Sequence, residues 1–176
     1  MIKDNKGFSL VELIIVIAVI GIAAGMLVGS NGFSVSQATS SLADSIKIAV
    51  GEARIKAMGK QETVLLITKD ATDGKYYKQL ISKVNDSVVP GEREVIGKAY
   101  PDVKFSVGGA VTNLDSSNYI LIGFDRTTGK LKSVNIDING DGMDETSVMC
   151  TNINVSGGAR SINVKIVPAT GKVSID

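Results

Sequence analysis

The sequence predicts an α+β fold in which a long N-terminal helix packs on a C-terminal antiparallel β-rich domain. The first observation is an apolar run over residues 8–28 that contains one charged residue. The second is a spacing of apolar residues by three and four over residues 37–59, which is typical of a helix with one buried face. The third is a series of short β-forming runs from residue 62 onward, separated by turn residues.

The apolar run has the length of a membrane span. A helix over residues 8–28 is about 31 Å long, which matches the hydrocarbon core of a bilayer. Residues 1–7 are polar and carry Lys3 and Lys6, which would hold the N-terminus in the cytoplasm. The expected organisation is therefore a leader at residues 1–7, a transmembrane or filament-core helix at residues 8–29 and an extracytoplasmic α+β domain at residues 30–176.

Glu12 decides between three interpretations of this N-terminus. A secretory signal peptide would be cut after the apolar run, where Ala23, Ala24 and Gly25 offer small residues. A plain membrane anchor would need no cut. Neither interpretation has a use for an acid one turn into the span, where ionisable residues are costly and usually functional.

The third interpretation comes from a family resemblance. The segment GFSLVEL at residues 7–13, after a charged leader and before an apolar run, resembles the processing motif of type IV pilins and type II secretion pseudopilins. The resemblance implies that a prepilin peptidase cuts after Gly7 and that Phe8 is then N-methylated. It also implies that Glu12 pairs with the N-terminal ammonium of a neighbouring subunit in a filament.

Physical chemistry agrees with that pairing. An α-amino group is largely cationic at neutral pH, so both it and Glu12 need a counter-charge inside a helix bundle. Gly21, Gly25 and Gly29 are spaced by four, and small residues on one face let helices approach closely. The same glycines also weaken a helix, by about 1 kcal/mol each relative to alanine.

The second helix is expected over residues 37–59, with its buried face formed by Leu42, Ile46, Ala49 and Ala53 and widened by Val50, Ala57 and Met58. Ser36 or Ser40 would cap its start and Gly59 would end it. Strands are expected at residues 63–68, 76–84, 94–96, 103–107, 119–124, 131–138, 145–151, 161–167 and 172–175. The turns between them contain the residues 72–74, 90–91, 108–109, 128–129, 139–140 and 157–158.

A looser resemblance concerns the rest of the chain. Residues 41–68 look like the helix-to-strand junction of H-type minor pseudopilins and their pilus homologues. Residues 122–129 and 162–175 resemble two hairpins of the same group. The resemblance implies a minor subunit of the H type.

A loop over residues 137–145 has the oxygen-rich spacing of a calcium site. Asp137, Asn139, Asp141 and Glu145 place carboxylate or amide oxygens at alternate positions around glycines, and such oxygens are the ligands of hard cations. The EF-hand pattern is incomplete because its closing acid would fall at Val148. A hairpin turn with solvated acids is the other interpretation, since Asn-Gly and Asp-Gly are favoured turn pairs.

Composition argues against catalysis and nucleic-acid binding. The chain has no histidine, a net charge of +1 and one cysteine, Cys150. Cys150 is expected to be a small half-buried apolar residue, with an intermolecular disulfide or a reactive thiol as the alternative. Without histidine the commonest general base and metal ligand are missing. Five basic residues would still provide a cluster for DNA if the fold gathers them: Lys98, Lys104, Arg126, Lys130 and Lys132.

The sequence therefore predicts a non-enzymatic structural subunit of a type IV pilus or pilus-like filament that requires no cofactor. A type II secretion pseudopilin is the first alternative, and an adhesin or DNA-uptake subunit is the second. The implied partners are other pilin subunits, a prepilin peptidase, an inner-membrane assembly platform with its motor, and membrane lipid before assembly. The expected location is the cell membrane first and an extracellular or envelope filament later.

Overall fold

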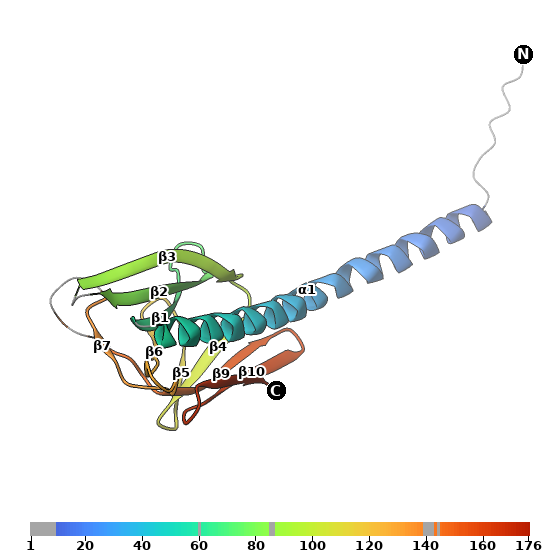
Figure 1. Ribbon diagram of the computed structural model, residues 1–176. Coiled ribbons are helices and arrows are strands. Elements are labelled where there is room, and N and C mark those ends of the chain that lie inside the picture. Colours follow the sequence, from blue (N-terminus) through green and yellow to red (C-terminus); the bar gives the residue numbers. More distant parts are fainter. Residues whose placement is uncertain (1–9, 60, 85–86, 139–142, 144) are drawn as a thin grey trace, which may run out of the picture. The chain divides into compact units, whose positions relative to one another are not determined.

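The computed structural model describes residues 10–59, 61–84, 87–138, 143 and 145–176. The chain forms two compact units, Met1–Ser34 and Val35–Asp176. Helix α1 (Leu10–Met58) begins in the first unit and ends in the second, and all the strands lie in the second (Figure 1). The helix continues through residues 29–32, where the glycines had suggested a boundary.

The buried face of α1 in the second unit is the predicted one. Leu42, Ile46, Ala49 and Ala53 have no exposed surface, and neither do Val50 and Ala57. Met58 was expected on this face but is 45% exposed. The helix ends at the predicted place, where the N–H of Gly59 donates to the carbonyl of Lys56 at 3.0 Å.

The predicted serine cap is wrong because α1 passes through it. Ser40 lies inside the helix and its hydroxyl donates to the carbonyl of Ser36, 3.2 Å away. Ser45 donates to Ser41 in the same way, at 2.8 Å. Hydroxyls in a helix interior commonly bond the carbonyl four residues earlier. A serine-rich stretch therefore marks a helix start only if the residues before it cannot be helical.

Two antiparallel sheets accompany the helix. The first has the strand order β3-β2-β1-β6 and the second has the order β11-β10-β9-β4-β5. The first sheet contains β1 (Glu62–Lys69), β2 (Tyr76–Val84), β3 (Ser87–Gly97) and β6 (Tyr119–Gly123). The second contains β4 (Asp102–Val107), β5 (Ala110–Asn113), β9 (Cys150–Gly157), β10 (Arg160–Val167) and β11 (Lys172–Ile175). The α+β class predicted from sequence is confirmed.

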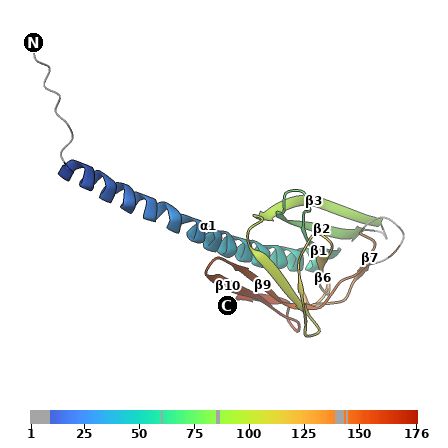
Figure 2. The ribbon, with the colours of Figure 1, turned by 180° about the vertical axis from the view of Figure 1, so that it is seen from behind.

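Within the second unit, α1 lies between the two sheets (Figures 1 and 2). One apolar cluster joins the helix face to residues of both sheets, among them Leu65, Ile122, Val155 and Val164. Side chains alternate along a strand, so the neighbours of Leu65 point the other way. On that far face Val64 and Leu121 form a smaller cluster with Ile81, Val134 and Ile136.

Several strand predictions were too long, too short or missing. The strand expected at residues 131–138 shrinks to β7 (Asn135–Ile136), and the one expected at residues 145–151 divides into β8 (Glu145–Thr146) and the start of β9. The side chain of Ser147 explains part of this, because its oxygen replaces a backbone partner by accepting the N–H of Val134 at 2.7 Å. The predicted turn at residues 90–91 instead lies inside β3, at a register irregularity.

Lys78 connects α1 to the edge of the first sheet. Its ammonium lies 2.7 Å from a carboxylate oxygen of Glu52 on α1 and 3.1 Å from one of Glu94 on β3. Only 12% of the lysine side chain is exposed, whereas a third of Glu52 is. The hydrogen bond from Lys78, followed by the one from Lys56, lowers the pKa of Glu52.

The lowered pKa of Glu52 gives a pH prediction. A carboxylate with a depressed pKa in the folded state stabilises the fold above its unfolded pKa, and this contribution is lost as the pH falls through the folded value. Glu52→Gln is therefore expected to lower the Tm at pH 7 and to have little effect at an acidic pH below the lowered pKa. Thermal unfolding of the full chain in detergent at both pH values measures this. An equal loss at the two pH values would mean that the effect of Glu52 is not electrostatic.

Candidate functional site

The first part of α1 exposes apolar side chains on every side. Among residues 10–22, all of which are exposed, the large apolar side chains have between 49% and 75% of their surface accessible. Glu12 is the only charged residue in this stretch. We call residues 10–22 the N-terminal apolar segment.

Such a surface is unfavourable in water. Burial of one large aliphatic side chain is worth about 1.5 to 3 kcal/mol, and the segment holds ten of the exposed leucine, isoleucine and valine residues. A helix that is apolar all round belongs in a membrane or in the core of a larger assembly. The second unit has its own apolar core, and no residue of this segment belongs to it.

Glu12 lies in the first turn of α1 and is exposed. An acid in the first turn is favourable because it faces the positive end of the helix dipole. The predicted processing residues Gly7 and Phe8 lie outside the described residues. The pairing of Glu12 with the terminal amine of another subunit therefore stays a prediction.

No helix in the part of the chain that was searched is both long and apolar enough to cross a membrane. The span predicted from sequence covers residues 8–29. Residues 8 and 9 of this span lie outside the described part, and the side chains of residues 23–29 are not described either. Gly21 is the one predicted small residue whose surroundings are described. A methyl group added there would meet nothing within 4 Å, so its face is open to an approaching helix.

The predicted calcium residues are only partly placed. Asn139 and Asp141 lie outside the described residues. Glu145 is paired in register with Ile136, and Asp137 follows directly, so both acids lie at the base of the loop. One carboxylate oxygen of Glu145 accepts the N–H of Ile138 at 2.8 Å. The residues that the structure describes contain no group of three metal-binding side chains.

Cys150 is a core residue and is more deeply buried than the predicted half-buried position. It has no exposed surface, and burial raises the pKa of its thiol to about 11. The thiolate is the reactive form of cysteine. A thiol with such a pKa is therefore unreactive at neutral pH.

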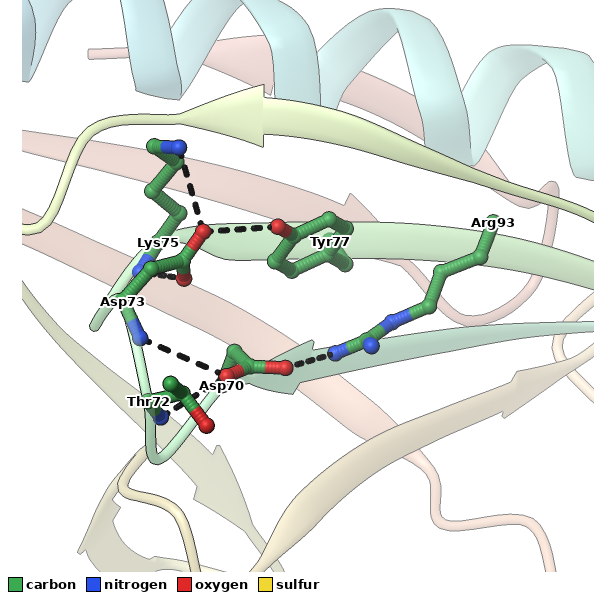
Figure 3. A network of polar contacts seen from close by, with 6 residues as sticks. All are labelled: Asp70, Thr72, Asp73, Lys75, Tyr77 and Arg93. Atoms are coloured by element: carbon green, nitrogen blue, oxygen red, sulfur yellow. Dashed lines mark hydrogen bonds and ion pairs between the residues drawn. The ribbon is translucent and has the colours of Figure 1, made fainter.

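A polar network that the sequence did not indicate lies at the turn between β1 and β2 (Figure 3). Asp70 accepts the N–H of Thr72 at 2.8 Å and binds the guanidinium of Arg93 at 2.9 Å. Arg93 also lies over the ring of Tyr77, 3.9 Å from its centroid, and the hydroxyl of Tyr77 donates to Asp73 at 2.8 Å. The network therefore ties the turn to β3.

The two carboxylates of this network are not suited to act as a general base. The backbone N–H of Thr72 is the largest cause that lowers the pKa of Asp70, and that of Lys75 lowers the pKa of Asp73. Both carboxylates are thus held ionised by structural hydrogen bonds, whereas a general base at neutral pH needs a raised pKa. The signal that would have located the network is Asp70 at the start of the predicted turn at residues 72–74.

Two of the five basic residues considered for DNA binding lie near acids. Lys104 lines a surface recess of about 350 Å³ together with Lys69, Asp102 and Asp115. Lys132 lies 3.9 Å from Glu62. Each acid cancels part of the positive field on which binding to phosphates depends.

Comparison with known proteins gives one match. Residues 2–28 match the family model described as the prokaryotic N-terminal methylation motif. Searches of curated proteins and of solved structures found no match. The motif implies processing by a prepilin peptidase and assembly with other pilin-like subunits, and it indicates a structural role. Residues 2–28 thus carry the signal of a type IV pilin-like or pseudopilin precursor.

Proposed function

We propose that this chain is a structural subunit of a type IV pilus or pilus-like filament. It is made as a prepilin, cleaved after Gly7, N-methylated at Phe8 and assembled through its N-terminal helix. The observation that supports this most is the overlap of the methylation motif, at residues 2–28, with the N-terminal apolar segment. One stretch of chain thus holds both a processing signal and an apolar helical surface that needs a neighbour.

Assembly in this proposal exchanges one apolar environment for another. Before assembly the segment lies in lipid, and afterwards it lies among the helices of other subunits. Lipid is as apolar as these side chains, so the exchange itself yields little hydrophobic free energy. Close packing at small residues such as Gly21 and the pairing of Glu12 must then supply the specificity.

The state of the mature N-terminus tests the proposal. We expect mass spectrometry of the protein from its native cells to find a chain that begins at N-methylated Phe8. A mature chain that begins near Gly25 would establish secretory cleavage and overturn the proposal. An uncut chain that begins at residue 1 would also overturn it, since a simple anchor needs no processing.

A type II secretion pseudopilin has the same N-terminal signal. The proposed resemblance of residues 41–68 and of two later hairpins is to H-type minor pseudopilins and their pilus homologues, so it fits both roles. Deletion of the gene separates the two roles. Loss of surface filaments with intact protein secretion supports a pilus subunit, whereas loss of secretion supports a pseudopilin.

We further propose that residues 137–145 bind one calcium ion. Asp137 and Glu145 at the base of the loop support this, because carboxylate oxygens are the ligands that calcium prefers. Calorimetry on the full chain in detergent is expected to give a Kd of about 0.1 to 1 mM, the range of extracellular calcium modules. Asp137→Asn should abolish the heat, and Asp115→Asn, at a turn elsewhere, should not. No heat from the unaltered chain at millimolar calcium would remove the proposal.

A further inference from the structure

The outward face of α1 in the second unit carries apolar residues that the fold leaves exposed. Ile48 is 66% exposed, Ile55 is 71% exposed and Met58 is 45% exposed. Between them lies Gly51, where an added methyl group would meet nothing within 4 Å. We call Ile48, Gly51, Ile55 and Met58 the outer stripe.

The spacing of the outer stripe is that of a helix-packing seam. Its residues are separated by three, four and three positions, so they lie in one line along the helix. This alternation is the pattern with which one helix packs against another through large side chains fitting between neighbours. The residues of the opposite face, such as Ile46, Ala49 and Ala53, are fully buried in the fold. The outer stripe is therefore a second apolar face on a helix whose first face is already used.

Scattered exposed isoleucines are common and need no explanation. Two β-branched residues seven positions apart, with a glycine between them, are a more specific pattern. Glycine in a helix interior costs about 1 kcal/mol relative to alanine. Within the fold no packing contact at Gly51 offsets this loss of stability, because no neighbouring atom lies within 4 Å of the place where a Cβ would be. A close approach by another helix would use that space.

We infer that the outer stripe binds the N-terminal apolar segment of a second copy of this chain. The inference rests on the proposed function and names the surface on which the segment of a neighbouring subunit packs. The argument for this occupant is that the chain itself displays an apolar helix in need of cover. Its residues 10–22 contain one charge, and Gly21 gives it an open position like that of Gly51.

Contact between two different surfaces of identical chains has a consequence for assembly. Each copy offers its stripe to one neighbour and its segment to another, so the contact does not close on itself. Such heterologous contacts produce rings or open helical filaments. A stripe that met the same stripe of an antiparallel neighbour would close on itself and would stop at a dimer.

Two substitutions separate assembly from folding. Gly51→Leu fills space that is empty in the fold and improves helix propensity, so its Tm is expected to equal or exceed that of the unaltered chain. Ile55→Glu removes apolar surface that is already exposed and should also fold. Both are expected to reduce the amount of the chain in sheared filaments at least tenfold. Tyr100→Glu, at a residue that is 72% exposed outside the stripe, should assemble normally.

Each outcome of this experiment has a defined meaning. If the unaltered chain has a methylated Phe8 and enters filaments, and Gly51→Leu and Ile55→Glu enter equally well, the inference about the stripe is overturned and the proposed function stands. If the unaltered chain has no methylated Phe8, the proposed function itself fails. Loss of assembly in both stripe variants, with processing and Tm retained, supports the inference.

Cysteine crosslinking identifies the occupant of the stripe. In a Cys150→Ala background, Ile17→Cys combined with Ile55→Cys is expected to give a ladder of covalent multimers in filaments. Neither cysteine alone should do so. Dimers from Ile55→Cys alone would show that the stripe packs on itself, and a crosslink to a different protein would show another partner. Either of these results would overturn the inference.

Discussion

Replacing Gly171 by alanine is expected to lower the free energy of unfolding by more than about 3 kcal/mol. The φ angle of Gly171 is +65°, in the left-handed region that residues with a Cβ rarely adopt. A Cβ at this position would collide with the carbonyl oxygen of Gly129. The new methyl group would therefore strain its own backbone and collide with a second turn.

Neither turn is free to move away from the collision. The carbonyl of Gly129 accepts the Nε–H of Arg54 on α1 at 3.2 Å, and the N–H of Gly171 donates to Val167 at 2.7 Å. The N–H of Leu131 donates to Pro168 at 3.0 Å and joins the two turns directly. A shift that makes room for the methyl group would break at least one of these hydrogen bonds.

Chemical denaturation of the full chain in detergent measures this loss, and Gly108→Ala is the matched control. Gly108 also has a left-handed φ, of +56°, but a methyl group there would meet nothing within 4 Å. The control should lose only the backbone cost of about 1 kcal/mol. If the two variants lost the same amount, the contact between the turns would contribute nothing, contrary to the structure.

These turns illustrate which parts of the fold the sequence could predict. The periodicity of Leu42, Ile46, Ala49 and Ala53 depends only on local helix geometry, and the burial of all four agrees with it. The strand at residues 76–84 was predicted with its bounds for the same local reason. The contact of Gly171 with Gly129 spans some forty residues and has no local signature.

Strands without an alternation of apolar and polar residues could not be predicted from the sequence. β5 consists of four exposed residues and has no alternation of apolar and polar side chains. It pairs with β4 because Gly108 and Gly109, both with positive φ, reverse the chain between them. The end of β9 was missed for a related reason, since Asn152 and Asn154 are polar, only partly buried and of a residue type that is depleted in strands.

The candidate site likewise has one part that the sequence predicts and one part that only the structure shows. The processing motif is a contiguous string of residues, so the sequence alone was enough to find it and the family match at residues 2–28 agrees. The outer stripe needed the structure, because the helical pattern predicts one buried face but not whether another part of the fold covers the opposite face. Ile48 and Ile55 are as apolar as Ile46, and only the positions of the two sheets separate them.

Replacing Glu12 by glutamine is expected to leave processing at Gly7 and Phe8 intact and to reduce assembly into filaments at least tenfold. Glutamine keeps the size of the side chain and the helix propensity, so the change is mainly the loss of charge. The N-terminal apolar segment contains no other charged residue. An N-terminal ammonium brought into contact with such segments would then have no carboxylate, and breaking a buried ion pair costs about 3 to 5 kcal/mol.

The amount of the variant in sheared filaments, together with mass spectrometry of its N-terminus, tests this expectation. Asp44→Asn is the matched control, because Asp44 is an exposed acid of the same helix outside the N-terminal apolar segment. It should assemble normally. Normal assembly of Glu12→Gln would show that the acid is not needed to neutralise an amine. The exposed apolar surface of residues 10–22 would then be sufficient for assembly, and close packing against surfaces such as the outer stripe would have to supply all of the specificity.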